Sequence, residues 1–266
     1  MSAALDKVFG TCRAEGRAAL VTYLPAGFPD NPGSREAMVA VVESGADVVE
    51  VGVPYTDPLM DGPVIQDAAD RALAGGFRVP DLLRNVETVA SAGGVAVVMS
   101  YWNPILRYGP DAFARDLAAA GGAGLITPDL IPDEAEGWTT AAEAYGIDPI
   151  FLVAPSSTDA RLAMTVAACR GFVYAASTMG VTGTRTSVGS SASELVARTK
   201  AVTDLPVCVG LGVSTGDQAA EVASFADGVI VGSALVRALG EGLASGEGLQ
   251  PLRTLTAELA AGVRRR

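Results

Sequence analysis

The stretch Asp47-Val-Val-Glu-Val-Gly-Val53 is the clearest strand signal in this chain of 266 residues. Valine occupies four of its seven positions, and β-branched side chains favour extended backbone. Apolar residues on both faces are typical of a parallel strand that is covered by helices. Gly45 just before it suits the end of a helix, and Pro54 just after it begins a loop. The stretch therefore predicts a buried parallel strand between a helix and a long loop.

The same unit, a short apolar strand followed by an Ala-rich amphipathic segment, recurs along the whole chain. Eight strands are predicted, at Ala19–Leu24, Asp47–Val53, Val95–Met99, Gly124–Thr127, Pro149–Val153, Phe172–Ala176, Pro206–Val209 and Gly228–Val231. The helices predicted between and after them lie near Arg35–Ser44, Pro80–Ala92, Asp111–Ala120, Glu134–Tyr145, Asp159–Ala168, Ser191–Ala201, Gly216–Ala223 and Ala234–Ala244. An extra N-terminal helix within Met1–Gly16 and an extra C-terminal helix near Leu249–Ala260 stand outside these units.

Eight strand–helix units close naturally into a barrel, and a doubly wound open sheet is the alternative. No Pro/Gly/Ser linker or shift in composition divides the chain. We therefore expect a single α/β domain over residues 1–266, a (β/α)8 or TIM barrel with one extra helix at each end. In such barrels the chemistry lies at the carboxyl ends of the strands, so functional residues are sought just after each strand.

The composition excludes several functions. A net charge of −11 argues against nucleic acid and anionic membranes as partners. No apolar stretch approaches the ~20 residues of a membrane helix, and the leading segment lacks the apolar core of a signal peptide. Cys12, Cys169 and Cys208 are odd in number and widely spaced, which fits neither disulfides nor a metal cluster. We expect a cytoplasmic protein without a metal.

The chain has no histidine, so a Ser-His-Asp triad, an imidazole acid or base and an ordinary His-bound zinc site are excluded. Its two lysines, Lys7 and Lys200, lie in polar helical segments and are expected on the surface rather than in a Schiff-base pocket. Proton transfer is left to Asp, Glu, Tyr and Cys.

Glycine-bearing segments follow the last three predicted strands, at Gly180-Val-Thr-Gly183, Gly210-Leu-Gly212 and Gly232-Ser233. Glycine lets backbone N–H groups approach an anion closely, and the helix that starts near Ser233 adds a positive dipole end. Each pair alone also suits an ordinary turn. Because all three follow consecutive strands where barrels often bind phosphate, together they predict a site for a phosphate ester.

Glu50 lies among apolar residues in a strand whose alternate side chains enter the barrel. Burial disfavours the ionised carboxylate, so its pKa is expected to rise toward neutrality, which suits proton transfer in both directions. The alternative is a structural carboxylate that is hydrogen-bonded to buried backbone or water.

Four aspartates need separate interpretations. Asp57 precedes Pro58 and is typical of a turn. Asp61 lies in the loop above the strand, where it could meet a bound ligand or cap the next helix. Asp129 follows the fourth strand and is a pocket candidate, although its flanking prolines also suit a turn. Asp227 precedes the eighth strand, on the face associated with stability.

The chain resembles the α subunit of tryptophan synthase over essentially its whole length. The motifs match in order and spacing: Thr22-Tyr-Leu-Pro-Ala-Gly27, Glu50-Val-Gly-Val-Pro-Tyr-Thr-Asp-Pro-Leu-Met-Asp-Gly-Pro-Val-Ile-Gln66, Tyr101-Trp-Asn-Pro, Gly180-Val-Thr-Gly183, Gly210-Leu-Gly-Val and Gly232-Ser-Ala. The segment from Glu50 to Gln66 is the most specific of them. The resemblance implies a barrel lyase that cleaves indole-3-glycerol phosphate to indole and glyceraldehyde 3-phosphate by a retro-aldol reaction, without a cofactor in this chain.

The resemblance also implies roles for individual residues. Glu50 and Asp61 match the catalytic pair. The substrate-binding positions matched are Tyr23, Met99, Asp129, Leu152, Tyr174, Thr182 and Leu211, and the phosphate-binding positions are Gly183, Gly212, Gly232 and Ser233. The chain departs from the family at Leu211, where Phe is frequent, and at Thr178, where some members have Arg. These departures concern packing around the substrate and loop closure.

A further implication is a partner β subunit that carries pyridoxal phosphate, takes up the released indole and forms an α2β2 complex. The loops at residues 54–63 and 178–191 would then order on substrate binding and face that partner, although a plain surface loop explains the composition of the second loop equally well. Two rival functions remain: a barrel isomerase or synthase for another small phosphate ester, and a barrel that mainly activates its partner and has vestigial turnover of its own.

Overall fold

The computed structural model describes residues 2–176, 190–210 and 212–265. Its eight strands are β1 (Ala19–Pro25), β2 (Val48–Gly52), β3 (Val95–Met99), β4 (Gly122–Thr127), β5 (Asp148–Val153), β6 (Val173–Ala176), β7 (Val207–Gly210) and β8 (Gly228–Val231). Every strand pairs in parallel with its sequence neighbours, and β8 closes against β1. The predicted (β/α)8 barrel is confirmed, and the open sheet is excluded.

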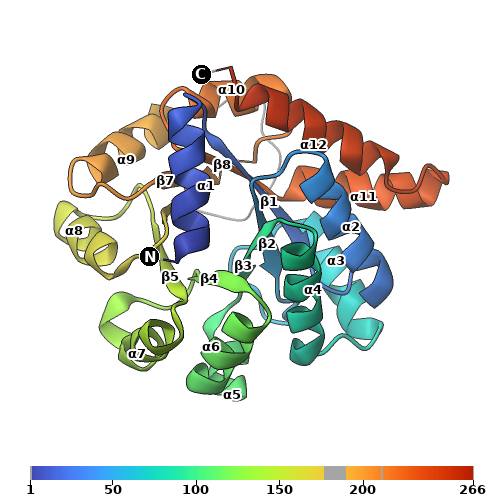
Figure 1. Ribbon diagram of the computed structural model, residues 1–266, viewed down its shortest axis with the longest axis horizontal. Coiled ribbons are helices and arrows are strands. Elements are labelled where there is room, and N and C mark those ends of the chain that lie inside the picture. The colour runs from blue at the N-terminus through green and yellow to red at the C-terminus, as the bar shows by residue number, and fades with distance from the viewer. Residues whose placement is uncertain (1, 177–189, 211, 266) are drawn as a thin grey trace.

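Helices alternate with the strands and surround the barrel (Figure 1). They are α2 (Asn31–Glu43), α3 (Pro63–Ala74), α4 (Val79–Ser91), α5 (Trp102–Tyr108), α6 (Pro110–Ala119), α7 (Glu136–Tyr145), α8 (Asp159–Ala168), α9 (Ser190–Lys200), α10 (Gly216–Ala223) and α11 (Ser233–Ser245), with a 3₁₀ turn η1 (Pro132–Glu134). The two extra helices are α1 (Ala3–Ala14) and α12 (Gln250–Gly262), as expected.

Two helices were not predicted, because the regular pattern suggests one helix after each strand. The connection from β2 to β3 holds both α3 and α4, and the connection from β3 to β4 holds both α5 and α6. α3 begins with Pro63 at its first turn, which suits a helix start but also resembles the end of the preceding loop. α5 has only seven residues, too few to show helical periodicity.

Apolar side chains form two cores. One lies between the strands and the outer helices, and the other fills the barrel interior, with Val21, Val48 and Val97 among its members. α1 lies across the near mouth of the barrel in Figure 1 and places Leu5, Phe9 and Cys12 in this inner core. α1 therefore closes the barrel at the amino ends of the strands.

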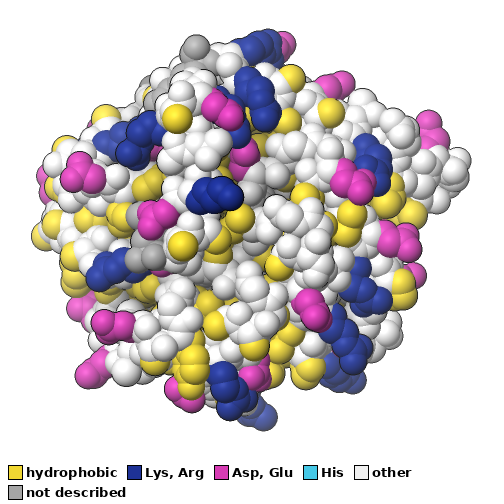
Figure 2. All heavy atoms as spheres, viewed as in Figure 1, with side chains coloured by type: hydrophobic (Ala, Val, Ile, Leu, Met, Phe, Trp, Pro, Cys, Tyr) yellow, Lys and Arg dark blue, Asp and Glu magenta, His cyan; other side chains and the backbone are white. Residues whose placement is uncertain are grey.

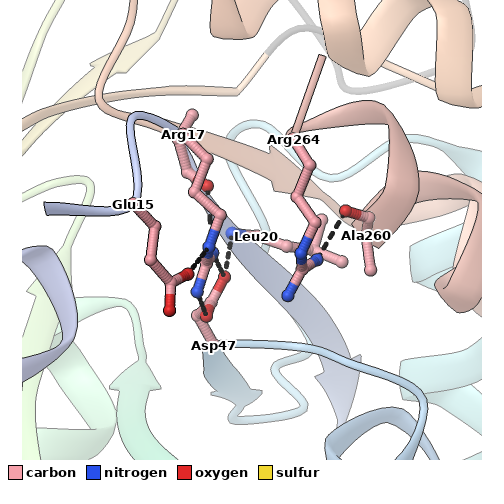
Figure 3. A network of polar contacts seen from close by, with 7 residues as sticks. Glu15, Arg17, Leu20, Asp47, Ala260 and Arg264 are labelled. Carbon is pink, nitrogen blue, oxygen red and sulfur yellow. Dashed lines mark hydrogen bonds and ion pairs between the residues drawn. The ribbon is translucent and has the colours of Figure 1, made fainter. Parts of the chain in front are cut away.

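Acidic groups at this closed end are tied to donors. Arg17 holds Asp47 through two hydrogen bonds of 2.8 and 2.9 Å, and Glu15 binds the same guanidinium (Figure 3). Asp148 accepts the Ser2 backbone N–H at 2.8 Å. Over the outer surface of this face, acidic and basic side chains are interspersed (Figure 2). No helix in the described part of the chain is long and apolar enough to cross a bilayer.

Candidate active site

Glu50 projects into the barrel from the middle of β2. It lies level with Tyr23 on β1 and Val97 on β3, and its side chain is 2% exposed. Burial, and secondarily the charge of Asp61, raises the pKa of Glu50 from 4.5 to about 8. Its Oε2 atom has no hydrogen-bond partner among the described residues. The expected rise in pKa is confirmed, and the carboxyl group can both give and take a proton near neutral pH.

Two tyrosines flank this carboxyl group. Burial and the nearby charges of Asp61 and Glu50 raise the pKa of Tyr23 well above 10, and burial and the charge of Glu50 do the same for Tyr174 on β6. Neighbouring glycines give the rings their room: a Cβ atom at Gly52 would overlap the Tyr23 phenol, and one at Gly210 would overlap the Tyr174 phenol. Both tyrosines therefore stay neutral, as hydroxyl groups beside Glu50.

Asp61 approaches from the loop between β2 and α3. Its Oδ1 atom accepts a hydrogen bond of 2.9 Å from the Tyr101 hydroxyl, and its backbone carbonyl accepts one of 2.7 Å from the Gln66 side chain. Burial raises the pKa of Asp61, and the bond from Tyr101 opposes that rise. The alternative role of Asp61 as a helix cap is wrong, because Gly62 is the N-cap of α3 and the helix has no side-chain cap. Asp61 is instead held toward the mouth of the barrel.

Two partly buried apolar side chains lie near the carboxyl ends of β3 and β5. Met99, at the end of β3, and Leu152, on β5, are half-buried and pack on the inner core. Leu152 lies level with Tyr174 on the neighbouring strand. Half-exposed apolar side chains beside buried acids suit a flat aromatic ligand better than a sugar.

The predicted phosphate site lies just after the last two strands. Gly212 follows β7 with a φ of +67°, a conformation that glycine adopts without strain. Gly232 follows β8 as the N-cap of α11, and Ser233 is buried at the first turn of this helix. The N-cap of α11 makes no side-chain hydrogen bond, so no described cap side chain occupies the amide groups of its first turn. Of the predicted residues, Thr178, Thr182, Gly183 and Leu211 lie outside the described part of the chain.

The other aspartates have structural partners. Asp129 is exposed, and its Oδ1 atom accepts the Trp102 backbone N–H at 2.8 Å, at the start of α5. Its predicted role in binding substrate stays a prediction. Asp57 is exposed and accepts a hydrogen bond from its neighbour Thr56, as a turn residue would. Asp227 pairs with Lys200 at 2.9 Å at the amino end of β8, consistent with a structural role.

Tyr101 is the residue that sequence reasoning did not assign to the site. Its motif follows directly after the third strand, at the edge where function is expected, but the sequence gives Tyr101 no role beyond the resemblance. The side chain is 4% exposed and lies between the loop of Asp61 and the start of α5. The position of Tyr101 just after a strand is the one signal in the sequence for a functional role. The contact between its ring hydroxyl and Asp61 does not follow from the spacing of the two residues.

No group of three or more acidic or cysteine side chains is arranged to hold a metal ion within the ranges that the structure describes. Cys12, Cys169 and Cys208 are all buried and free. Burial raises the pKa of the Cys12 thiol to about 11 and that of Cys169 to about 12, so both remain protonated at neutral pH.

Comparisons with known proteins agree with this geometry. The family model described as tryptophan synthase alpha chain matches residues 9–263. The chain is 67% identical over 262 residues to the tryptophan synthase alpha chain of Mycobacterium ulcerans, covering 98% of this chain and 95% of the relative. It superposes on Mycobacterium tuberculosis tryptophan synthase with a TM-score of 0.94 at 64% identity, over 99% of each chain. For the alpha subunit from Legionella pneumophila the TM-score is 0.87 at 33% identity, over 100% of this chain and 98% of that one.

The expected activity is thereby confirmed at the level of the family: a carbon–carbon lyase of tryptophan biosynthesis that cleaves indole-3-glycerol phosphate. The eight strands of the barrel and the matched motifs all lie within the residues that the family model covers. This chain belongs to the tryptophan synthase alpha chain family.

Proposed function

We propose that this chain cleaves indole-3-glycerol phosphate through two carboxyl groups with different tasks, Glu50 as the proton carrier and Asp61 as the anion that meets the indole N–H. The observation that carries the proposal is the buried, unpaired Glu50, whose pKa of about 8 keeps it able to exchange protons near neutrality. No described cation holds either carboxyl group in a permanent ion pair. The acids are therefore available to a ligand.

The cleavage transfers two protons and breaks one carbon–carbon bond. Indole C3 gains a proton, which leaves positive charge on the ring nitrogen. The hydroxyl on the adjacent side-chain carbon loses its proton, its oxygen forms the aldehyde carbonyl, and the electrons of the C3–carbon bond return to the ring. Glu50 serves both proton transfers, and Asp61 stabilises the charge at nitrogen by accepting the N–H hydrogen bond. The products are indole and glyceraldehyde 3-phosphate, with atoms and charge balanced.

The substrate would span the mouth of the barrel. The indole ring would lie on Met99 and Leu152 between Tyr23 and Tyr174, which supply the apolar surface and the neutral hydroxyl groups described above. Thr182, Leu211 and Asp129 complete the predicted contacts of the ring and side chain.

The phosphate would lie at the opposite end of the pocket. The amide groups at the start of α11 and the hydroxyl of buried Ser233 are donors that suit an anion, and Gly212 and Gly232 let the backbone approach closely. Gly183 is the remaining predicted member. This local arrangement compensates for an overall charge of −11, which otherwise repels an anionic substrate.

We further propose that the mouth of the barrel docks a β subunit that holds pyridoxal phosphate, in an α2β2 complex. Three of the large exposed apolar side chains lie after consecutive strands at the carboxyl face: Leu59 after β2, Leu106 on α5 after β3, and Ile131 after β4, with exposures of 73%, 55% and 39%. An apolar surface beside the site would be covered by the partner and would keep released indole from escaping. The loops at 54–63 and 178–191 would border this contact.

Two further features complete the proposal. The free, buried thiols suit a reducing, cytoplasmic compartment. Closure of β8 against β1 suits one domain over residues 1–266, since a chain whose first and last strands pair leaves no division between them.

The direct test is release of glyceraldehyde 3-phosphate from indole-3-glycerol phosphate, measured with and without the β subunit. We expect release in both cases and faster release with the partner. Replacement of Leu59 by Asp should weaken stimulation by the partner without affecting the unstimulated rate, and Val202→Asp is the matched control, because Val202 is exposed at the opposite end of the barrel, before β7. No release under either condition would refute the proposed function.

A further inference from the structure

Tyr101 joins two parts of the catalytic loop through one oxygen atom. Its hydroxyl lies 2.9 Å from Asp61 Oδ1 and 3.1 Å from the backbone nitrogen of Met60. A backbone N–H can only donate, so the tyrosine oxygen accepts from Met60 and its own proton is directed to Asp61. The side chain is 4% exposed, which restricts water from replacing either bond. The hydroxyl thus fixes both the carboxylate and the backbone that carries it.

The ring that carries this hydroxyl is itself fixed. It packs on Tyr55 with ring centroids 5.5 Å apart, and the Tyr55 hydroxyl accepts a hydrogen bond of 3.1 Å from the Asn103 side chain. The next residue, Trp102, donates its backbone N–H to Asp129. Three consecutive residues at the start of α5 therefore connect the loop after β2 with the loop after β4.

The type of partner matters as much as the distance. An arginine in this place would keep Asp61 in a strong ion pair, as Arg17 keeps Asp47 at the other end of the barrel. A tyrosine hydroxyl supports the anion with a weaker bond, and it occupies only Oδ1 of the two carboxylate oxygens. Oδ2 is then free of Tyr101 and can turn to the ring nitrogen of a substrate.

We infer that Tyr101 is a positioning residue of this lyase, which holds the Asp61 carboxylate and its loop so that the second oxygen meets the indole N–H. The inference rests on the proposed role of Asp61 and adds a residue to which neither the sequence nor the comparisons assign a role. Tyr101 itself exchanges no proton with the substrate.

The surroundings determine a pH signature. Glu50 on β2, Tyr23 on β1 and Tyr174 on β6 face Asp61 across the mouth, and burial keeps the tyrosines neutral. The hydrogen bond from Tyr101 lowers the pKa of Asp61 against the effect of burial. Loss of that bond should raise the pKa of Asp61, so a larger part of the enzyme is inactive at low pH. The basic limb of the profile, which Glu50 governs, should not move.

The test is Tyr101→Phe, which keeps the ring and its packing on Tyr55 but removes the hydroxyl. The variant is assayed in the complex with the β subunit. We expect its kcat to fall about tenfold or more, because hydrogen bonds to charged groups are stronger than those between neutral groups. KM should stay within about twofold, and the acid limb of kcat/KM should move to higher pH. The melting temperature should change little. The matched control is Tyr108→Phe, which removes a bond of 2.7 Å from a tyrosine hydroxyl to Asp116, away from the proposed site.

The same substitution in an Asp61→Asn background completes the design. If Tyr101 acts through Asp61, its removal there should change kcat by less than about twofold. Wild-type kcat in Tyr101→Phe, an unshifted acid limb, or an equal loss in the Asp61→Asn background would each overturn the inference. The proposed function fails separately, when the wild-type enzyme itself releases no glyceraldehyde 3-phosphate.

Discussion

The two ends of the barrel treat carboxyl groups in opposite ways. At the amino ends of the strands, Asp47, Asp148 and Asp227 each have a close donor: the Arg17 guanidinium, the Ser2 N–H and the Lys200 ammonium group. Toward the carboxyl ends, Glu50 has an oxygen without a partner among the described residues, and Asp61 has a tyrosine hydroxyl. Each end has one acid that is 2% exposed, Asp148 at the amino end and Glu50 inside the barrel, so burial alone does not distinguish the ends; the presence of a permanent donor does.

The contrast is sharpest within β2 and the residue before it. Asp47 and Glu50 are three positions apart, yet Asp47 accepts bonds from Arg17 and from the Leu20 N–H, whereas burial raises the pKa of Glu50 to about 8. A charge that is fully paired stabilises the fold and cannot react. A buried acid that lacks a partner costs stability and can react. One strand therefore has a structural acid at its start and a proposed catalytic acid inside the barrel.

The largest expected effect comes from Glu50→Gln. Loss of the proton carrier should lower kcat by about three or more powers of ten, at the upper end of what acid–base catalysis contributes. Substrate binding should stay measurable, because Gln keeps the shape of the side chain. Turnover and the affinity for a glycerol phosphate analogue measure the two effects. A variant with near-normal turnover would show that Glu50 is merely another structural acid.

Asp61→Asn should have an effect of similar or slightly smaller size. An amide cannot carry the negative charge that compensates the ring nitrogen, so we expect kcat to fall by about two to three powers of ten. Asp57→Asn, on the same loop but exposed, is the control and should stay within about twofold of wild type. Single-turnover cleavage separates this effect from product release. Equal turnover in the two variants would remove Asp61 from the mechanism.

The amino end should respond in stability rather than in rate. Asp47→Asn leaves the Arg17 guanidinium without its main partner, so we expect the free energy of unfolding to fall by about 3 kcal/mol. Turnover per folded molecule should be unchanged. Asp217→Asn is the control: its pair with Arg265 is exposed, and its loss should cost less than about 1 kcal/mol. Urea unfolding compares the variants, and equal stabilities would end the contrast between the two faces.

The phosphate end allows a test of charge at a helix start. Ser233→Asp places an anion where the substrate phosphate is expected, so affinity for a glycerol phosphate analogue should fall at least tenfold, by about 1.4 kcal/mol or more. Thr158→Asp adds the same charge at the start of α8 and should leave affinity unchanged. Calorimetric titration measures both. Undiminished affinity in Ser233→Asp would place the phosphate elsewhere.

The sequence predicts the strands of the barrel more successfully than the segments that connect them. Strand positions, barrel closure and the inward direction of Glu50 follow from period and spacing, because a parallel strand has only two faces and the strand order is consecutive. The expected rise in the pKa of Glu50 follows from the same pattern. These features depend on local sequence and on the alternation of strands and helices.

Contacts between connecting segments could not be predicted in the same way. The hydrogen bonds from Tyr101 to Asp61 and from Trp102 to Asp129 join residues that are 40 and 27 positions apart in the sequence. Whether these residues meet depends on the conformation of two loops and of the short α5. These loops adjoin α3 and α5, the two helices that the sequence does not predict. The proline at the start of α3 also suits the end of a loop, and α5 has too few residues to show helical periodicity. The geometry of the site therefore depends on the least predictable elements.

A final expected effect is a pH-dependent difference in stability between the wild type and Glu50→Gln. The pKa of Glu50 is raised from 4.5 to about 8 in the folded state, so between these values the unfolded chain releases a proton that the folded chain keeps. The contribution of Glu50 to stability is then fullest below pH 4.5 and is lost as pH rises toward 8. Glu50→Gln has no such loss. Its advantage over the wild type should grow by at most about 1.4 kcal/mol per pH unit between about pH 5 and pH 8 in urea unfolding. A constant difference would mean that Glu50 finds a partner after all, and the distinction between Asp47 and Glu50 would fail.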